Sequence, residues 1–157
     1  MRRLLGGTLV GLSATLIMEY AGSFLYERES EAVRHKEEQG RKDDMPTITL
    51  VRKPAAALGR QLDDKSAERL GTVAHFAFGS GSGPLIVMLT RSGMDPAKAG
   101  LAVGMGMWVL VDEGLNPIAG LTAGPGAFSP VTHLHAAAAH AVYGLNGGLL
   151  LAAGARD

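Results

Sequence analysis

Apolar residues in this chain gather into four long runs that are separated by more polar segments. The runs cover residues 4–25, 68–90, 98–116 and 131–153. Each contains about 20 residues, enough at a rise of ~1.5 Å per residue to cross a hydrocarbon core ~30 Å thick. The pattern predicts an all-α polytopic membrane protein, with four transmembrane helices that form one membrane domain over residues 1–157.

The charged residues are concentrated between the first two runs. Residues 26–69 hold ten of the fifteen basic and ten of the fifteen acidic side chains. We therefore expect residues 26–67 to form a charged connection outside the membrane. A polar helix over residues 26–44 should continue the first span, and residues 55–62 should form a short amphipathic helix at the interface. Counting basic residues places this connection in the cytoplasm and both termini on the opposite side.

Composition excludes several classes of protein and of site. The chain contains no cysteine, so it has no disulfide and no thiolate metal site. Its formal charge is zero, without the basic surplus that a nucleic-acid-binding protein needs. The first run follows Arg2 and Arg3, as a secretory signal would. However, it is longer than a signal core and carries Glu19 and Tyr20 where a cleavage site needs small residues, so we expect it to be a span.

Two alignments of the chain with itself match its apolar runs in pairs. The first run aligns with the third, and the second aligns with the fourth. The matched positions are, in pairs, Gly7 and Gly100, Glu19 and Asp112, Gly79 and Gly144, and His75 and His140. This correspondence predicts two helical hairpins repeated in tandem, of which the first has acquired the charged connection.

Each predicted span also contains two glycines separated by three residues. The pairs are Gly7 and Gly11, Gly79 and Gly83, Gly100 and Gly104, and Gly144 and Gly148. Glycines four positions apart lie on one helix face, where they allow the backbone of a neighbouring helix to approach closely. The four pairs therefore predict a compact bundle.

A small set of ionisable residues falls within the predicted spans. These residues are Glu19, His75, Asp112, Glu113 and His140. Ionisable side chains are costly in a bilayer, where they usually face the bundle interior and find a partner. Glu19 and Asp112 occupy equivalent depths, and His75 and His140 enter their helices from the same side. The sequence therefore predicts a polar layer inside the bundle.

The residue types leave four interpretations of this layer open. Carboxylates and imidazoles can fix helix register through hydrogen bonds, or they can relay protons and bind cations. A divalent cation could be held by His133, His135 and His140. Alternatively, His75 and His140 could bind a haem as its two axial ligands. Intramembrane hydrolysis is the fourth interpretation, although no serine stands out as a nucleophile.

The second half of the chain resembles a known family. The residues that carry the resemblance are Gly106-Met107-Trp108, Asp112-Glu113, Asn116-Pro117, Gly120-Leu121, Pro130, His133 and His140-Ala141-Val142-Tyr143-Gly144. They are similar to the YagU-like family of small bacterial inner-membrane proteins, whose function is unknown. The resemblance covers about a third of the chain. It implies a location in the bacterial inner membrane and implies no activity.

We therefore predict a membrane protein whose polar layer acts in proton- or cation-linked transport. No catalytic residue is identified, which favours a protein that is not an enzyme. The alternative is a non-catalytic structural or assembly subunit that recruits a partner through residues 26–67. The lipid bilayer is the expected surrounding. Because four spans are few for a monomeric transporter, a homo-oligomer or a larger membrane complex is also expected.

Overall fold

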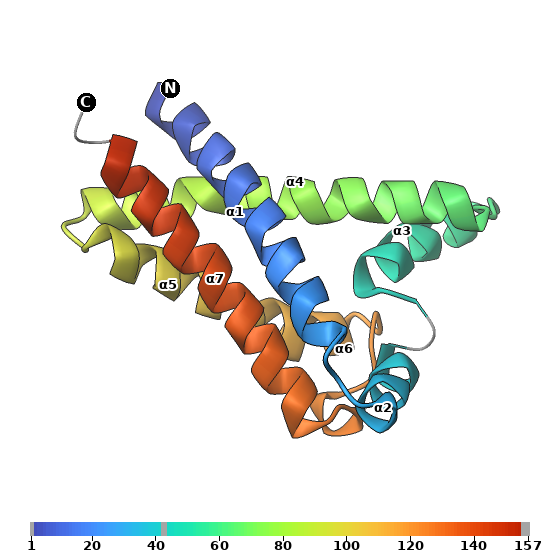
Figure 1. Cartoon of the computed structure of the whole chain (residues 1–157). Helices are drawn as coiled ribbons and strands as arrows, with labels where there is room; N and C mark the ends of the chain where they lie inside the picture. Colours follow the sequence, from blue (N-terminus) through green and yellow to red (C-terminus); the bar gives the residue numbers. More distant parts are fainter. Residues whose placement is uncertain (1, 42–43, 155–157) are drawn as a thin grey trace.

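All regular secondary structure in the described part of the chain is helical. The computed structural model describes residues 2–41 and 44–154, and these ranges contain no strand. The elements are α1 (Arg2–Tyr26), α2 (Glu31–Arg41), α3 (Pro46–Ala57), α4 (Asp64–Arg91), α5 (Pro96–Met107), the π-helix η1 (Trp108–Leu115), α6 (Asn116–Ile118), the 3-10 helix η2 (Pro125–Ala127) and α7 (Pro130–Gly154). The predicted all-α class is confirmed (Figure 1).

Three helices are long and apolar enough to cross a membrane. They are Leu5–Tyr26, Asp64–Arg91 and Pro130–Gly154. Large apolar side chains point outward on these helices, as Leu9 on α1 and Leu149 on α7 illustrate with exposed fractions of 65 % and 61 %. Outward apolar side chains suit contact with lipid tails, because no water has to solvate them there. The fold is therefore that of a helical membrane protein.

The third apolar run is helical but is not one regular α-helix. Its first part is α5, and from Trp108 to Leu115 the backbone becomes the π-helix η1. A π-helix closes its hydrogen bonds over five residues instead of four, which widens the helix and changes the direction of the side chains that follow. As a result, this run does not belong to the three helices that qualify on length as membrane-crossing.

The long helices pack as two close pairs that are joined side by side. In Figure 1, α1 and α7 cross α4 obliquely, and α5 lies along α7. The contacts of α1 are with α4 and α7, whereas α7 contacts both α1 and α5. Helix α3 packs against α4, and α2 lies near the end of α1. The bundle therefore has an N-terminal helix pair, α1 with α4, and a C-terminal helix pair, α5 with α7.

Glycine contacts bring the helices of each pair close together. A Cβ atom on Gly83 would collide with the carbonyl oxygen of Gly7, and one on Gly100 would collide with the carbonyl oxygen of Gly144. The other four glycines of the predicted pairs face similarly close atoms of a neighbouring helix; they are Gly11, Gly79, Gly104 and Gly148. These contacts place helix backbones against one another, which is possible only without a side chain.

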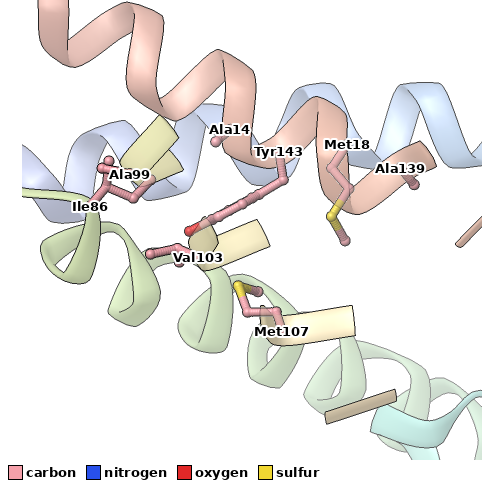
Figure 2. Close-up of a cluster of buried hydrophobic side chains, with 8 residues drawn as sticks. All are labelled: Ala14, Met18, Ile86, Ala99, Val103, Met107, Ala139 and Tyr143. Carbon is pink, nitrogen blue, oxygen red and sulfur yellow. The ribbon is translucent and has the colours of Figure 1, made fainter. Parts of the chain in front are cut away.

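A small apolar cluster holds the two helix pairs together (Figure 2). Its members come from all four long elements: Ala14, Met18, Ile86, Ala99, Val103, Met107, Ala139 and Tyr143. Tyr143 is fully buried and extends across the middle of the cluster. Its hydroxyl donates a hydrogen bond of 2.6 Å to the carbonyl oxygen of Gly79, so α7 is tied directly to α4.

The charged connection differs from the prediction in its first half. The polar helix expected over residues 26–44 does not continue α1, because α1 ends at Tyr26 and a separate helix, α2, begins at Glu31. Ser30 precedes α2, and its hydroxyl accepts a hydrogen bond from the backbone of Val33, as expected of an N-cap. The turn folds α2 back toward the bundle. Residues 42–43 of the expected helix lie outside the described residues.

The second half of the connection also differs. The short helix expected over residues 55–62 is wrong in position, because α3 runs from Pro46 to Ala57. Pro46 occupies the first turn, where its missing N–H costs no hydrogen bond. The helix ends before Gly59, whose φ of 70° is in the left-handed region that glycine adopts readily.

Candidate functional site

The candidate site is a cavity of about 1360 Å³ between the two helix pairs and the charged connection. Residues from α1, α2, α3, α4, η1 and α7 line it. All five residues of the predicted polar layer belong to the lining, namely Glu19, His75, Asp112, Glu113 and His140. His133, His135, Glu29 and Glu37 line it as well.

Two imidazole–carboxylate pairs on the cavity wall link neighbouring long elements. His75 Nε2 on α4 is 2.9 Å from Glu19 Oε1 on α1. His140 Nε2 on α7 is 3.6 Å from Asp112 Oδ2 on η1. These are the carboxylates and histidines that the sequence repeat matches. The structure therefore brings together Glu19 with His75, and Asp112 with His140.

Hydrogen bonds fix the orientation of the His140 ring. Its Nδ1 lies 3.0 Å from the carbonyl oxygen of Ala136, which can only accept, so Nδ1 carries a hydrogen. The second nitrogen, Nε2, is left facing Asp112. The Asn116 amide donates to the other side of the Asp112 carboxylate over 3.4 Å. At 3.6 Å the Nε2–Oδ2 contact is longer than a hydrogen bond, and it is an ion pair only when the imidazole is protonated.

Two further pairs on the cavity wall involve histidines near the beginning of α7. His133 Nδ1 is 2.6 Å from Glu113 Oε1, and its Nε2 is 3.0 Å from the carbonyl oxygen of Pro125. His135 Nδ1 is 2.6 Å from Glu29 Oε1. Since a carbonyl only accepts, His133 Nε2 carries a hydrogen that it donates to Pro125, and Nδ1 faces the Glu113 carboxylate. In total, four imidazole–carboxylate pairs line one cavity.

The π-helix explains how two consecutive residues serve two pairs. Asp112 and Glu113 are neighbours in η1, yet their partners are His140 and His133, which lie on different turns of α7. Consecutive side chains on a π-helix diverge less than on an α-helix because each turn contains more residues. Both carboxylates can therefore face the cavity. The sequence shows no signal that distinguishes this segment from a regular helix.

A compact group of charges lies where α2 meets the cavity. The Glu29 side chain is only 1 % exposed, and its Oε2 atom has no hydrogen-bond partner among the described residues. The nearby Glu37 carboxylate forms an ion pair with Arg41. Burial raises the pKa of Glu37, Arg41 opposes this shift, and the charge of Glu29 adds to it. The sequence predicts Glu37 and Arg41 only as part of the polar helix over residues 26–44, and it gives no signal for Glu29.

The three histidines expected to share a metal ion do not converge on one point. His133, His135 and His140 each face a different carboxylate. The described residues form no group of three or more histidine, aspartate or glutamate side chains arranged to hold a metal ion. His75 and His140, the expected haem ligands, face Glu19 and Asp112. These positions do not fit a metal or haem site.

Comparison with known proteins adds no relative. No protein-family model matches the chain, and neither the curated proteins nor the solved structures contain a significant match. The resemblance to the YagU-like family therefore stays an expectation from the sequence.

Proposed function

We propose that this protein is a four-span component of a bacterial inner membrane that carries out proton-linked transport through the cavity. The single observation that supports this function most strongly is the set of four imidazole–carboxylate pairs along one cavity. Histidine changes charge near neutral pH, and a neighbouring carboxylate stabilises the charged form. Each pair can therefore take up and release a proton at little cost.

The four pairs also line one and the same cavity, as a relay requires. Their carboxylates are Glu19, Glu29, Asp112 and Glu113. Asp112 and Glu113 are consecutive in η1, so the two pairs that they form are neighbours. A proton that enters the cavity has titratable groups available along its wall.

Helical continuity supports the fourth span. Helix α5, η1 and α6 follow one another without a break from Pro96 to Ile118. A segment of this length, about 20 residues at ~1.5 Å rise, is sufficient to cross a bilayer. The matched glycine contacts within the two helix pairs support the tandem-hairpin origin. The outward-facing leucines of α1 and α7 offer surfaces for lipid or for a second copy in a homo-oligomer.

The direction in which α2 folds favours transport over the assembly alternative. A recruiting helix would extend its charges into solvent, whereas α2 buries Glu37 and Gly40 against the bundle. Gly40 packs on Phe128, and its carbonyl accepts a hydrogen bond of 2.8 Å from Ala123. The charged connection thus forms part of the cavity wall.

Proton flux in proteoliposomes tests this function. The purified protein is reconstituted with an entrapped pH indicator, and a potassium diffusion potential drives protons inward. We expect flux in the parent protein and a large loss in Asp112→Asn and His140→Ala. Glu31→Gln, an exposed change on α2, serves as the control and should keep the flux.

The assembly alternative makes the opposite forecast. It predicts no protein-dependent flux in any variant, together with loss of cellular function when residues 30–60 are deleted. Flux that survives both Asp112→Asn and His140→Ala would show that the polar layer is not the pathway.

A further inference from the structure

We propose that the cavity binds an amphiphilic organic cation, a molecule with one permanent or protonated positive group on an apolar, aromatic-sized body. This inference builds on the proposed function, because it identifies the class of compound that proton movement would drive. Three independent features of the cavity support it: its charge balance, its aromatic lining and an unpartnered carboxylate oxygen.

The charge balance of the cavity is strongly negative. Counting only described residues, seven of the chain's fifteen acidic residues line it, compared with one of the fifteen basic residues, Arg41. Four histidines also line it. Even if all four imidazoles carried a proton, the seven carboxylates would outnumber the five positive groups. A cation is therefore the ligand that balances this cavity.

The apolar part of the lining suits an organic body rather than a small inorganic ion. Although the chain has only eight phenylalanine, tyrosine and tryptophan residues, five of them line the cavity. These are Tyr26, Phe76, Phe78, Phe128 and Tyr143. Aromatic faces attract cations and bury apolar surface at the same time. The volume of about 1360 Å³ is above the ~300–1,000 Å³ of ordinary small-molecule sites, so a bulky ligand fits.

Glu29 supplies the position for the positive group. Its side chain is 1 % exposed and lines the cavity, and its Oε1 already contacts His135. Its Oε2 is buried without a hydrogen-bond partner. A buried carboxylate that lacks a full set of partners favours a positive charge placed nearby. The ligand's positive group would lie on the Glu29 side of the cavity, where this negative charge attracts it, and the ligand's body would contact the apolar and aromatic lining.

Equilibrium binding in lipid nanodiscs tests the inference with tetraphenylphosphonium as the probe. This ion carries a permanent charge, so its own protonation cannot contribute. Tetraphenylborate has the same shape and the opposite charge, and empty nanodiscs give the partition into lipid. We expect saturable binding of the phosphonium alone, at one site per chain. Glu29→Gln should raise its Kd by at least about tenfold, as for a buried charge that loses its partner.

Matched variants keep the test decisive. Glu31→Gln removes the same charge from the exposed side of α2 and should leave the Kd unchanged. If Glu29→Gln does not fold, Glu19→Gln serves instead. It changes a half-exposed carboxylate of the cavity wall and should also weaken binding. Equal uptake of both ions, or a Kd that neither Glu29→Gln nor Glu19→Gln alters, would overturn the inference.

Failure of this inference can be distinguished from failure of the proposed function. Proton flux without phosphonium binding would remove the ligand class and leave proton transport standing. Phosphonium binding without proton flux would leave a cation-binding site in a protein that does not transport protons.

Discussion

Each helix pair of the bundle has one carboxylate next to one histidine, but the surroundings of these side chains differ. In the N-terminal pair, Glu19 and His75 are 2.9 Å apart and their side chains are 50 % and 28 % exposed. In the C-terminal pair, Asp112 and His140 are 3.6 Å apart and are 38 % and 9 % exposed. Both carboxylates lie at matched positions of the sequence, but Asp112 is on a π-helix and Glu19 is on a regular α-helix.

This difference places the two carboxylate–histidine pairs in environments of different polarity. Electrostatic interactions weaken where water reaches them and strengthen where it does not. The N-terminal pair is therefore the wetter position, where a proton exchanges readily with the cavity. The C-terminal pair is the drier position, where the charge state of one group has the larger effect on its partner. Residues at matched sequence positions thus have unequal environments, and the helix type differs between them.

The largest effect that tests this comparison should come from the glycine contacts, because both helix pairs depend on them equally. Gly83→Ala and Gly100→Ala each place a methyl group against backbone of the facing helix. We expect each to lower the free energy of unfolding by about 2–3 kcal/mol, since backbone cannot move aside as a side chain can. Thermal unfolding in detergent measures both.

Matched controls exist in the same helices. A Cβ on Gly81 of α4 or on Gly106 of α5 would meet nothing within 4 Å. Gly81→Ala and Gly106→Ala should change stability by at most about 1 kcal/mol, the amount by which alanine exceeds glycine in a helix. If Gly83→Ala is damaging but Gly100→Ala is tolerated, the two pairs do not share one packing mode.

The next-largest effect distinguishes Asp112 from Glu19 by the proton flux that is lost when each is changed. Asp112→Asn should lower proton flux by at least about tenfold, equivalent to ~1.4 kcal/mol on the limiting barrier, and Glu19→Gln should lower it by about threefold. The reason is that water can replace a half-exposed carboxylate more easily than one beside the buried His140. Flux assays of the two variants side by side give the ratio. Equal losses, or a larger loss for Glu19→Gln, would contradict the wet and dry assignment.

A smaller effect concerns the Tyr143 hydroxyl, which links the two helix pairs. In the predicted repeat, Tyr143 matches Phe78, which is 49 % exposed, whereas Tyr143 is fully buried. Tyr143→Phe makes the two positions alike and removes the bond to the Gly79 carbonyl. We expect a loss of about 1–2 kcal/mol in unfolding free energy, the value of a buried hydrogen bond with its acceptor left unpaired.

Denaturant titration in mixed detergent micelles measures the loss from Tyr143→Phe. Tyr20→Phe is the control, because Tyr20 is 76 % exposed on α1. If both variants unfold at the same denaturant concentration as the parent, the hydroxyl does not stabilise the contact between α4 and α7.

The sequence predicts some features of this comparison and not others. The apolar runs predict the long helices, and the matched positions predict one polar layer of carboxylates and histidines at similar depth. Which carboxylate faces which histidine is not predictable, because the order of helices around a bundle is set by tertiary contacts. The π-helix is not predictable, since its residues have no distinct periodicity. The role of Glu29 is not predictable either, because it depends on how the chain turns after Tyr26, and turn direction is set by tertiary contacts that no local pattern encodes.

The smallest effect concerns the charged connection, which contributes α2 to the cavity wall. The pKa of Glu37 is raised above its unfolded value of 4.5, mainly by burial. The folded state therefore holds this proton more tightly than the unfolded state. The stability that Glu37 contributes is fully present below pH 4.5 and is lost as the pH rises through the raised value. Docking of α2 should therefore loosen as the medium becomes less acidic.

Hydrogen exchange along α2 measures this loosening, once intrinsic exchange rates have been removed from the data. Protection should fall a few-fold with rising pH in the parent and should stay level in Glu37→Gln. Arg41 on α2, Glu29 in the preceding turn and His135 on α7 surround the same position, so each variant must be compared with the parent at every pH. Glu31→Gln changes an exposed carboxylate of α2 and should keep the fall. A fall that persists in Glu37→Gln would mean that another of these groups, and not Glu37, controls how firmly α2 covers the cavity.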